Sequence, residues 1–315
     1  MYLVTGATEF IGAAVLRHLN QFGLPVRILL RPGRETPPLP SGISLDVALS
    51  STLDSRGVRA AMVGVKTLIH LAGAENYRKR PRELRQDVIG ARNLAEAAAE
   101  AGVENIILVS QIGADRHSFF ATSRSSAEQE DHFMRCGVPV TTLRTSVVFG
   151  QGDSFTTSIA QMLTIAPLLF PLPGDGKVQL QPLWVQDLAT CIMWLLEEPE
   201  LLGSTYEIGG PEYISFHDLV HIIMHAISAP RITFTFRQPY LRRLATILDR
   251  IFPRFPVKEL WLDFLAVDRT AEINTLPSVI GLEPSRFEER IAYLGQRNWG
   301  WEFILRQFGR NVQVE

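Results

Sequence analysis

Two glycines near the start of the sequence have the spacing of a backbone turn that can bind phosphate groups. Gly6 and Gly12 lie in the stretch Val-Thr-Gly-Ala-Thr-Glu-Phe-Ile-Gly, between a short apolar segment and a helical pattern. Glycine permits a sharp turn and a close approach of a helix to a strand. The N–H groups and dipole at the start of that helix would attract the pyrophosphate of a dinucleotide. The residues predicted to form this site are Gly6, Thr8, Glu9, Phe10, Ile11 and Gly12. An ordinary strand–turn–helix is the alternative interpretation.

The first half of the chain alternates apolar strands with helical patterns. Strands are predicted at 2–5, 26–30, 43–46, 67–71, 106–109 and 140–143, and helices at 10–22, 82–101 and 123–135. Strands that are apolar throughout and separated by helices are typical of a parallel sheet covered on both faces. We therefore expect an α/β fold with a doubly wound, Rossmann-type sheet over 1–148. The less regular remainder, 149–315, predicts a smaller, mainly helical cap that returns a few strands to the first domain.

Composition excludes several classes of function. The 315 residues include 31 basic and 33 acidic side chains, so the net charge of −2 gives no indication of nucleic-acid binding. Cys136 and Cys191 lie far apart, which predicts neither a disulfide framework nor a metal site. No basic leader and no apolar run of about 18 residues is present, so we expect a cytoplasmic protein, at most peripheral to the inner face of a membrane.

Two segments of the second half could contact a partner. Over 236–252, apolar residues recur at helical spacing on one face, and arginines lie largely off it. Over 299–308, two tryptophans are flanked by arginines. Either segment suits a protein complex or an anionic membrane surface. The alternative for the first is a helix that packs its apolar face on its own domain.

Further blocks agree with the glycine turn. They are 71–73 (Leu71, Ala72, Gly73), 90–94, 109–110, 143–150, 173–177, 184–189 and 206–211. Together they resemble the extended and atypical short-chain dehydrogenases/reductases, which include NAD-dependent epimerases and dehydratases. The branch with the strongest resemblance is that of the nucleotide-binding accessory subunit of respiratory complex I. The resemblance implies an NAD(P) site that extends to Leu71, Ala72 and Gly73.

The glycine turn departs from the pattern of this family. Glu9 occupies the middle glycine, where the family's backbone approaches the pyrophosphate. Repulsion between its carboxylate and a phosphate would cost on the order of a few kcal/mol before screening. We expect weakened dinucleotide binding, with complete loss as the alternative.

The choice between NAD and NADP depends on the end of the second strand. In the family an acidic residue there favours a ribose hydroxyl, whereas arginine favours a 2′-phosphate. This sequence has no acid at that point but has Arg31 and Arg34, so NADP(H) is expected over NAD(H). Asp46 stands where the family places an aspartate that contacts adenine; a loop cap is the alternative.

The family's proton donor is missing. Its tyrosine, followed four residues later by a lysine, aligns with Phe120 and Arg124. Phenylalanine has no hydroxyl to donate, although an arginine could still hold the nicotinamide ribose. The family's serine aligns with Ser110, and the substitute acids to consider are Tyr77, His117 and Ser118.

Three functions follow from this pattern. The first is a non-catalytic accessory, assembly or sensor protein that holds NADP(H). The second is an active NADP(H)-dependent reductase or epimerase with a different acid. The third is a scaffold that binds no cofactor.

Overall fold

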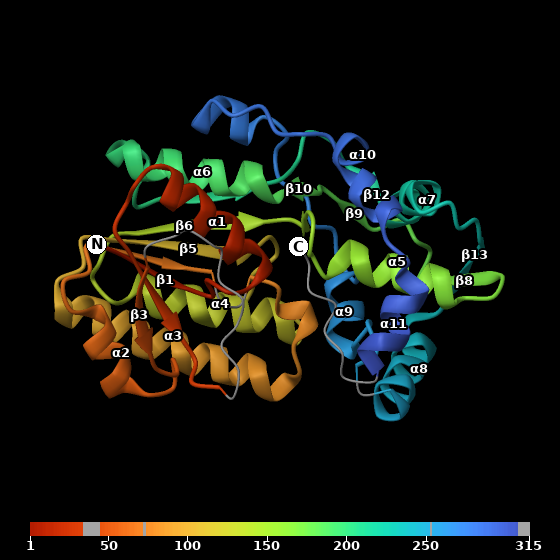
Figure 1. Cartoon of the computed structure of the whole chain (residues 1–315), viewed down its shortest axis with the longest axis horizontal. Helices are drawn as coiled ribbons and strands as arrows, with labels where there is room; N and C mark the ends of the chain where they lie inside the picture. The colour runs from red at the N-terminus through yellow and green to blue at the C-terminus, as the bar shows by residue number, and fades with distance from the viewer. Residues whose placement is uncertain (34–44, 72–73, 253, 308–315) are drawn as a thin grey trace.

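Seven parallel strands form the central sheet of the protein, whose computed structural model describes residues 1–33, 45–71, 74–252 and 254–307 (Figure 1). In spatial order they are β11 (Thr205–Ile208), β6 (Val140–Thr145), β5 (Asn105–Gln111), β4 (Thr67–His70), β1 (Tyr2–Thr5), β2 (Val26–Leu30) and β3 (Leu45–Leu49). Every neighbouring pair is parallel. The prediction of a doubly wound parallel sheet is confirmed.

Helices cover both faces of this sheet. One face carries α1 (Phe10–Gln21) and α6 (Val185–Glu197); the other carries α2 (Ser55–Met62), α3 (Pro81–Ala101) and α4 (Ala121–Met134). Each layer of helices packs on the strands through its own buried apolar cluster. Because the central strands lose water on both faces, all four residues of β4 are buried rather than every second one.

The strand predicted at 43–46 lies further along the chain, at Leu45–Leu49. Among the described residues it pairs only with β2, at the edge of the sheet, so most of its side chains remain in contact with solvent. An edge strand needs no continuous apolar run, and its ends are therefore poorly marked in the sequence. The other strands and helices predicted for the first half begin and end within a few residues of their observed bounds.

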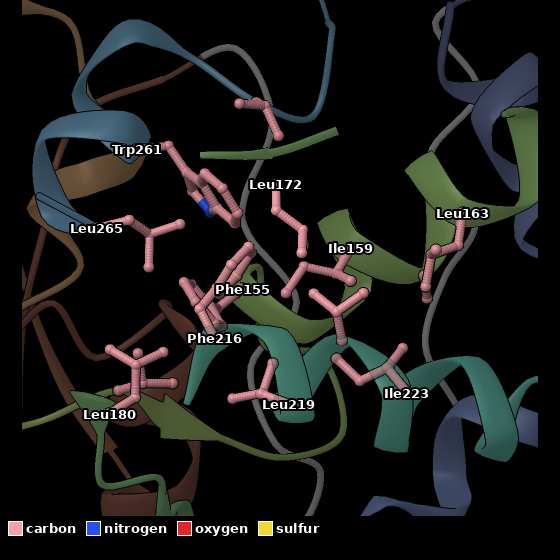
Figure 2. Packing of buried hydrophobic residues seen from close by; sticks show 14 of the residues in the cluster. Phe155, Ile159, Leu163, Leu172, Leu180, Phe216, Leu219, Ile223, Trp261 and Leu265 are labelled. Carbon is pink, nitrogen blue, oxygen red and sulfur yellow. The ribbon is translucent and has the colours of Figure 1, made fainter. Parts of the chain in front are cut away.

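The remainder of the chain builds a second apolar core beside the carboxyl ends of β5 and β6. Its helices are α5 (Phe155–Ile165), α7 (Phe216–Ala226), α8 (Gln238–Ile251), α9 (Glu259–Phe264), α10 (Phe287–Arg290) and α11 (Trp299–Gln307). Its paired strands are β7 (Val148–Phe149) with β10 (Leu183–Trp184), β9 (Gln179–Leu180) with β12 (Ile214–Ser215), and β8 (Leu169–Pro173) with β13 (Ile232–Phe236). Figure 2 shows Phe155, Phe216 and Trp261 together among aliphatic side chains. The rings of Phe155 and Trp261 stack with centroids 5.2 Å apart.

The two halves of the chain share one sheet. β11 and α6 follow residue 148, yet β11 extends the sheet beside β6 and α6 packs against α1. In the described part of the chain, no helix combines the length and the apolarity required to cross a bilayer.

The sheet changes winding direction between β1 and β4. From β1 the chain moves outward through β2 and β3, then returns to place β4 on the opposite side of β1. The crossover connections diverge at such a point, which leaves a crevice at the carboxyl ends of the strands. The structure therefore places the glycine turn, which follows β1, at the position where α/β sheets bind ligands.

Candidate functional site

The turn after β1 has the backbone geometry that the glycine spacing predicts. Gly6 has φ of 78°, in the left-handed region that favours glycine. A Cβ on Gly12 would overlap the carbonyl oxygen of Gly6, so only glycine lets α1 start this close to the turn. The first-turn N–H groups of α1 have no acceptor within the helix and remain available to an anion.

A cavity of about 350 Å³ opens at this turn. Its lining comes from the turn, the end of β2, the segment after β3 and the first half of α3. The lining residues are Thr5, Gly6, Thr8, Glu9, Leu29, Leu30, Arg31, Ser50, Thr52, Lys79, Glu83, Gln86 and Asp87. Of the predicted cofactor residues, the cavity brings together Gly6, Thr8, Glu9 and Arg31.

The other predicted cofactor residues lie elsewhere or outside the description. Ile11 is buried in the core under the sheet, and the ring of Phe10 packs against Gly150. Leu71 is buried, and its N–H donates to the carbonyl oxygen of Thr5 at 3.0 Å. Three further predicted cofactor residues, Arg34, Ala72 and Gly73, lie outside the described residues.

The position predicted for Asp46 is corrected by the structure. Asp46 is the second residue of β3, at the end of the strand opposite to the cavity, and it is absent from the cavity lining. Its carboxylate pairs with Arg27 of the neighbouring strand at 2.7 Å. The segment that follows β3 instead supplies Ser50 and Thr52. The shift of the edge strand along the chain is the cause.

Acidic groups gather around the cavity. Glu9 directly precedes α1 and is half-buried, and burial raises the pKa of its carboxyl group; Lys79 opposes that rise while Glu75 and Asp87 add to it. Lys79 donates to Asp87 at 2.7 Å, and this half-buried ion pair lies in the cavity wall. In this cavity, therefore, the ammonium group of Lys79 is already paired with Asp87, and the buried carboxyl group of Glu9 resists ionisation.

The buried carboxylate of Glu75 holds the short 3₁₀ helix η1 (Asn76–Arg78) in place. Its oxygens accept hydrogen bonds from the hydroxyls of Tyr77 and Ser154, both at 3.0 Å, and from the Arg78 guanidinium at 3.2 Å. Lys79 directly follows η1, so these contacts fix the loop that brings its ammonium group to Asp87. Sequence analysis missed Glu75 and Lys79, because a polar loop carries no periodic signal.

The position of the family's tyrosine is the N-cap of α4. Phe120 is half-buried there and has an extended backbone conformation. Arg124, four residues later, donates through Nη1 to the carbonyl oxygen of Ser118 at 2.6 Å, which ties the guanidinium to the preceding loop. Arg124 also lines a separate shallow groove between α3 and α4. Neither side chain is among those that line the larger cavity.

The three substitute acids lie in different environments. Tyr77 is buried in the second core, and burial together with Glu75 raises the pKa of its phenol well above the ordinary value. His117 is exposed. The Ser118 hydroxyl accepts from the Phe120 N–H at 3.1 Å, as in a turn that leads into a helix.

A second group of polar atoms, beside the carboxyl end of β5, was largely missed from the sequence. The Ser110 hydroxyl, both amide atoms of Gln111 and the hydroxyl of Thr122 are buried and have no hydrogen-bond partner within the described residues. Close by, the fully buried guanidinium of Arg269 donates to the carbonyl oxygens of Ile112 and Phe264. Burial lowers the pKa of Arg269 to about 10, and no carboxylate among the described residues pairs with it. In the sequence, Arg269 is a single arginine in an irregular segment, and nothing there distinguishes it from an arginine on the surface.

Comparison with curated proteins adds to this geometry. The family described as NAD(P)H-binding matches residues 6–156. The mitochondrial NADH dehydrogenase (ubiquinone) 1 alpha subcomplex subunit 9 of Rattus norvegicus is 30% identical over 226 residues, which are 70% of this chain and 59% of the relative. A ceramide reductase of Caulobacter vibrioides is 28% identical over 198 residues, 63% of this chain and 61% of the relative. The chain spans about three fifths of the length of these relatives.

Solved structures share the whole fold. An NADPH-dependent quinone oxidoreductase of Escherichia coli, solved with NADPH, has a TM-score of 0.74 and 19% identity, and the match covers 93% of this chain and 99% of that one. A nucleoside-diphosphate-sugar epimerase of Staphylococcus aureus has a TM-score of 0.73 and 16% identity over the same shares. These matches support the resemblance to the atypical short-chain dehydrogenases/reductases that the sequence predicts. Residues 6–156 match an NAD(P)H-binding family, in agreement with the glycine turn.

Most of the site fits a nicotinamide dinucleotide. The left-handed Gly6, the free N–H groups of α1 and Arg31 suit a phosphorylated ligand. Glu9 opposes it, since its side chain lines the same cavity. When bound, a nicotinamide dinucleotide supplies hydride; the residues described above would bind and orient it.

Proposed function

We propose that this protein binds NADP(H) as a structural or sensory ligand and does not catalyse hydride transfer. The observation that carries the proposal is the pair at the start of α4. Phe120 offers no proton, and Arg124 is held by Ser118 rather than by a neighbouring phenol. A carbonyl reductase needs a proton donor beside the carbonyl oxygen, and tuned acids typically contribute about 10²–10⁴-fold to rate.

Two measurements test this proposal together. Native mass spectrometry of the freshly purified protein is expected to find NADP(H) bound, and the protein is expected not to oxidise NADPH in the presence of small carbonyl compounds. The double substitution F120Y/R124K is expected to introduce slow turnover, because it restores the phenol and the lysine that lowers its pKa. Steady NADPH oxidation by the wild-type protein that is lost when the cavity is altered would refute the proposal.

The preference for NADP(H) rests on Arg31. It follows β2, lines the cavity, and is exposed, so its guanidinium can pair with a 2′-phosphate. The cavity wall at this point contains no carboxylate from β2 that would accept a ribose hydroxyl. Competition between NADPH and NADH for the purified protein measures the preference directly.

We further propose that the protein acts as an accessory or assembly factor of a larger complex. Two relatives are named as subunits of the mitochondrial NADH dehydrogenase. A cytoplasmic protein in such a role would lie at the inner face of the membrane that holds the complex. Co-purification of the tagged protein with respiratory-complex subunits would support this role; recovery of the protein alone from gently solubilised membranes would oppose it.

An active reductase is the second candidate, and the relative named ceramide reductase favours it. The Ser110 hydroxyl, at the position of the family's serine, is buried and has no hydrogen-bond partner within the described residues, so it is the group we assign to contact a carbonyl oxygen. Loss of any measured activity in S110A, with NADPH binding unchanged, would support this candidate over the first.

A scaffold without a cofactor is the third candidate, and Glu9 in the cavity favours it. Failure of the wild-type protein to bind either nucleotide, together with binding by E9G, would make it the best description.

A further inference from the structure

An apolar band crosses the surface of the C-terminal region, from β13 onto α8. On β13, Ile232, Phe234 and Phe236 point to the same face because side chains alternate along a strand. All three are exposed. The ring of Phe236 lies 6.0 Å from that of Phe234 and 6.2 Å from that of Tyr240, which continues the band onto the helix. We define the apolar band as Ile232, Phe234, Phe236, Tyr240, Leu244, Ile247 and Ile251.

Helix α8 has a separate stripe for its own core. Leu241 and Ala245 are buried against the C-terminal region, and this part of the alternative interpretation of 236–252 is correct. Leu244, Ile247 and Ile251, which the sequence placed on that same face, are instead 43%, 55% and 62% exposed. With 3.6 residues per turn, Tyr240 and these three residues form one line about a third of a turn from the buried stripe. The exposed line is therefore not needed for the fold that the structure describes.

Cationic side chains border the band. Residues 231–258 contain seven basic residues and one acidic residue, whereas the whole chain has a net charge of −2. On α8, Arg243 and Arg250 lie on the side of the exposed line that faces away from the buried stripe, as helical spacing requires. Both are exposed, and neither forms an ion pair within the described residues. Arg242, in contrast, is occupied by Asp263 and Glu259.

Helix α11 adds a second exposed apolar area near the end of α8. Phe303 of α11 contacts Phe252 and Phe255. Trp299 is buried, and its indole N–H donates to Leu294 at 2.7 Å, while Trp301 is 58% exposed. Residues of the predicted segment 299–308 thus divide between the core and the surface; its last residue lies outside the described part. An exposed tryptophan suits the boundary between lipid headgroups and acyl chains.

We propose that the apolar band and its bordering arginines dock on an anionic lipid bilayer. Apolar side chains beside guanidinium groups match the layering of such a surface, where acyl chains lie below phosphates. The unpaired Arg243 and Arg250 supply charge complementarity that an apolar groove in a protein would not use. The inference rests on the proposed location at a membrane, but it is independent of the dinucleotide cavity, which lies on the other part of the chain.

Co-sedimentation with lipid vesicles tests the proposal. The full chain is expected to bind vesicles of phosphatidylcholine with phosphatidylglycerol, and binding is expected to weaken as salt rises. L244S/I247S and R243E/R250E are each expected to reduce the bound fraction by about tenfold at matched lipid concentration. The matched control R17E/V63S changes an exposed arginine and an exposed valine on the Rossmann part, and its binding is expected to equal that of the wild type.

The outcomes separate the alternatives. Thermal unfolding and NADPH binding, measured on every variant, are expected to match the wild type and thereby show that the fold is retained. Absence of wild-type binding to the anionic vesicles, or equal loss in the control, would overturn the proposal and leave a protein partner as the occupant of the band. If the wild-type protein fails to bind NADPH but still binds the anionic vesicles, the proposed function is refuted and this inference stands.

Discussion

At the scale of single residues, Glu9 decides how much negative charge the cavity presents to a phosphate. Burial raises the pKa of its carboxyl group, so lowering the pH protonates Glu9 sooner than an exposed glutamate. We expect the affinity for NADPH to rise as pH falls through that pKa, and E9Q to bind about tenfold more tightly than the wild type in mildly alkaline buffer. Titration of NADPH fluorescence across the pH range measures both effects.

The 2′-phosphate of NADPH also changes its protonation with pH, and it does so equally in measurements on the wild type and on E9Q. Only the difference between the two pH profiles reports on Glu9. Profiles that run parallel, with no gain in affinity for E9Q, would show that the Glu9 carboxyl group turns away from the bound phosphates.

Lys79 is the counterpart of Glu9 in the same cavity. Its ammonium group pairs with Asp87 and lowers the cost of ionising Glu9. K79M would leave Glu9, Glu83 and Asp87 in the cavity wall without this cation, so we expect NADPH affinity to fall by about tenfold. Isothermal titration calorimetry measures the change. K66M, which removes an exposed lysine from a surface ion pair, is the control and is expected to keep wild-type affinity.

Arg31 provides the prediction on cofactor selectivity. R31A is expected to weaken NADPH binding about three- to tenfold and to leave NADH binding nearly unchanged, because only NADPH carries the second phosphate. The ratio of the two dissociation constants is the quantity to measure. A uniform loss for both nucleotides would place Arg31 at the pyrophosphate rather than at the ribose.

At the scale of elements, the turn between β1 and α1 depends on Gly12. A side chain there would collide with the backbone of Gly6 and Ala7, which cannot move without displacing β1. G12A is expected to lower the free energy of unfolding by about 1–3 kcal/mol and to abolish dinucleotide binding. Chemical denaturation measures the first effect. G300A is the control: its added methyl would lie 3.1 Å from a methyl group of Thr164, away from the cavity, and the helix gains propensity, so its stability should change far less.

Element-scale patterns explain what could be predicted from sequence. The central strands are apolar throughout because both faces are buried, and these continuous apolar runs therefore identified the parallel sheet and placed the turn with Gly6. The edge strand has no such signal, and Asp46 was misplaced with it. Lys79 meets Asp87 only because η1 and the start of α3 fold back, a contact that depends on Glu75 beneath the loop. Sequence spacing carries no information about that fold-back.

At the scale of the whole molecule, buried polar contacts join the Rossmann part to the C-terminal region. The hydroxyl of Ser146, after β6, donates to the carbonyl oxygen of Arg269 at 2.6 Å, and Arg269 in turn reaches Ile112 after β5. These contacts bring together segments more than a hundred residues apart, and no local pattern predicts them. R269M is expected to cost about 1–3 kcal/mol of unfolding free energy, because the carbonyl oxygens of Ile112 and Phe264 would lose their donor. Thermal unfolding measures it; an unchanged midpoint would contradict a role in joining the two parts.

Asp153 makes the stability of the molecule depend on pH through a contact of the same kind. Its buried carboxyl group accepts a hydrogen bond from the backbone N–H of Thr156 at 2.7 Å. It accepts another, also at 2.7 Å, from the phenol of Tyr293, which lies in the segment Ile291–Gln296. Burial raises its pKa from 3.8 to about 6 in the folded protein. The folded state therefore binds this proton more tightly than the unfolded state does. The stability that results is fully present below the unfolded pKa and is lost as pH rises through about 6.

The substitution D153N isolates this contribution, since an amide keeps the shape but does not ionise. A shift of about two pKa units corresponds to roughly 3 kcal/mol between mildly acidic and neutral conditions. We expect the free energy of unfolding of the wild type, minus that of D153N, to fall by an amount of this order as pH rises from about 4 to about 7. Denaturant unfolding of both proteins at each pH supplies the difference. A constant difference would mean that the four donors around Asp153, from Gly150, Thr156 and Tyr293, stabilise the carboxylate enough to cancel the cost of burying it.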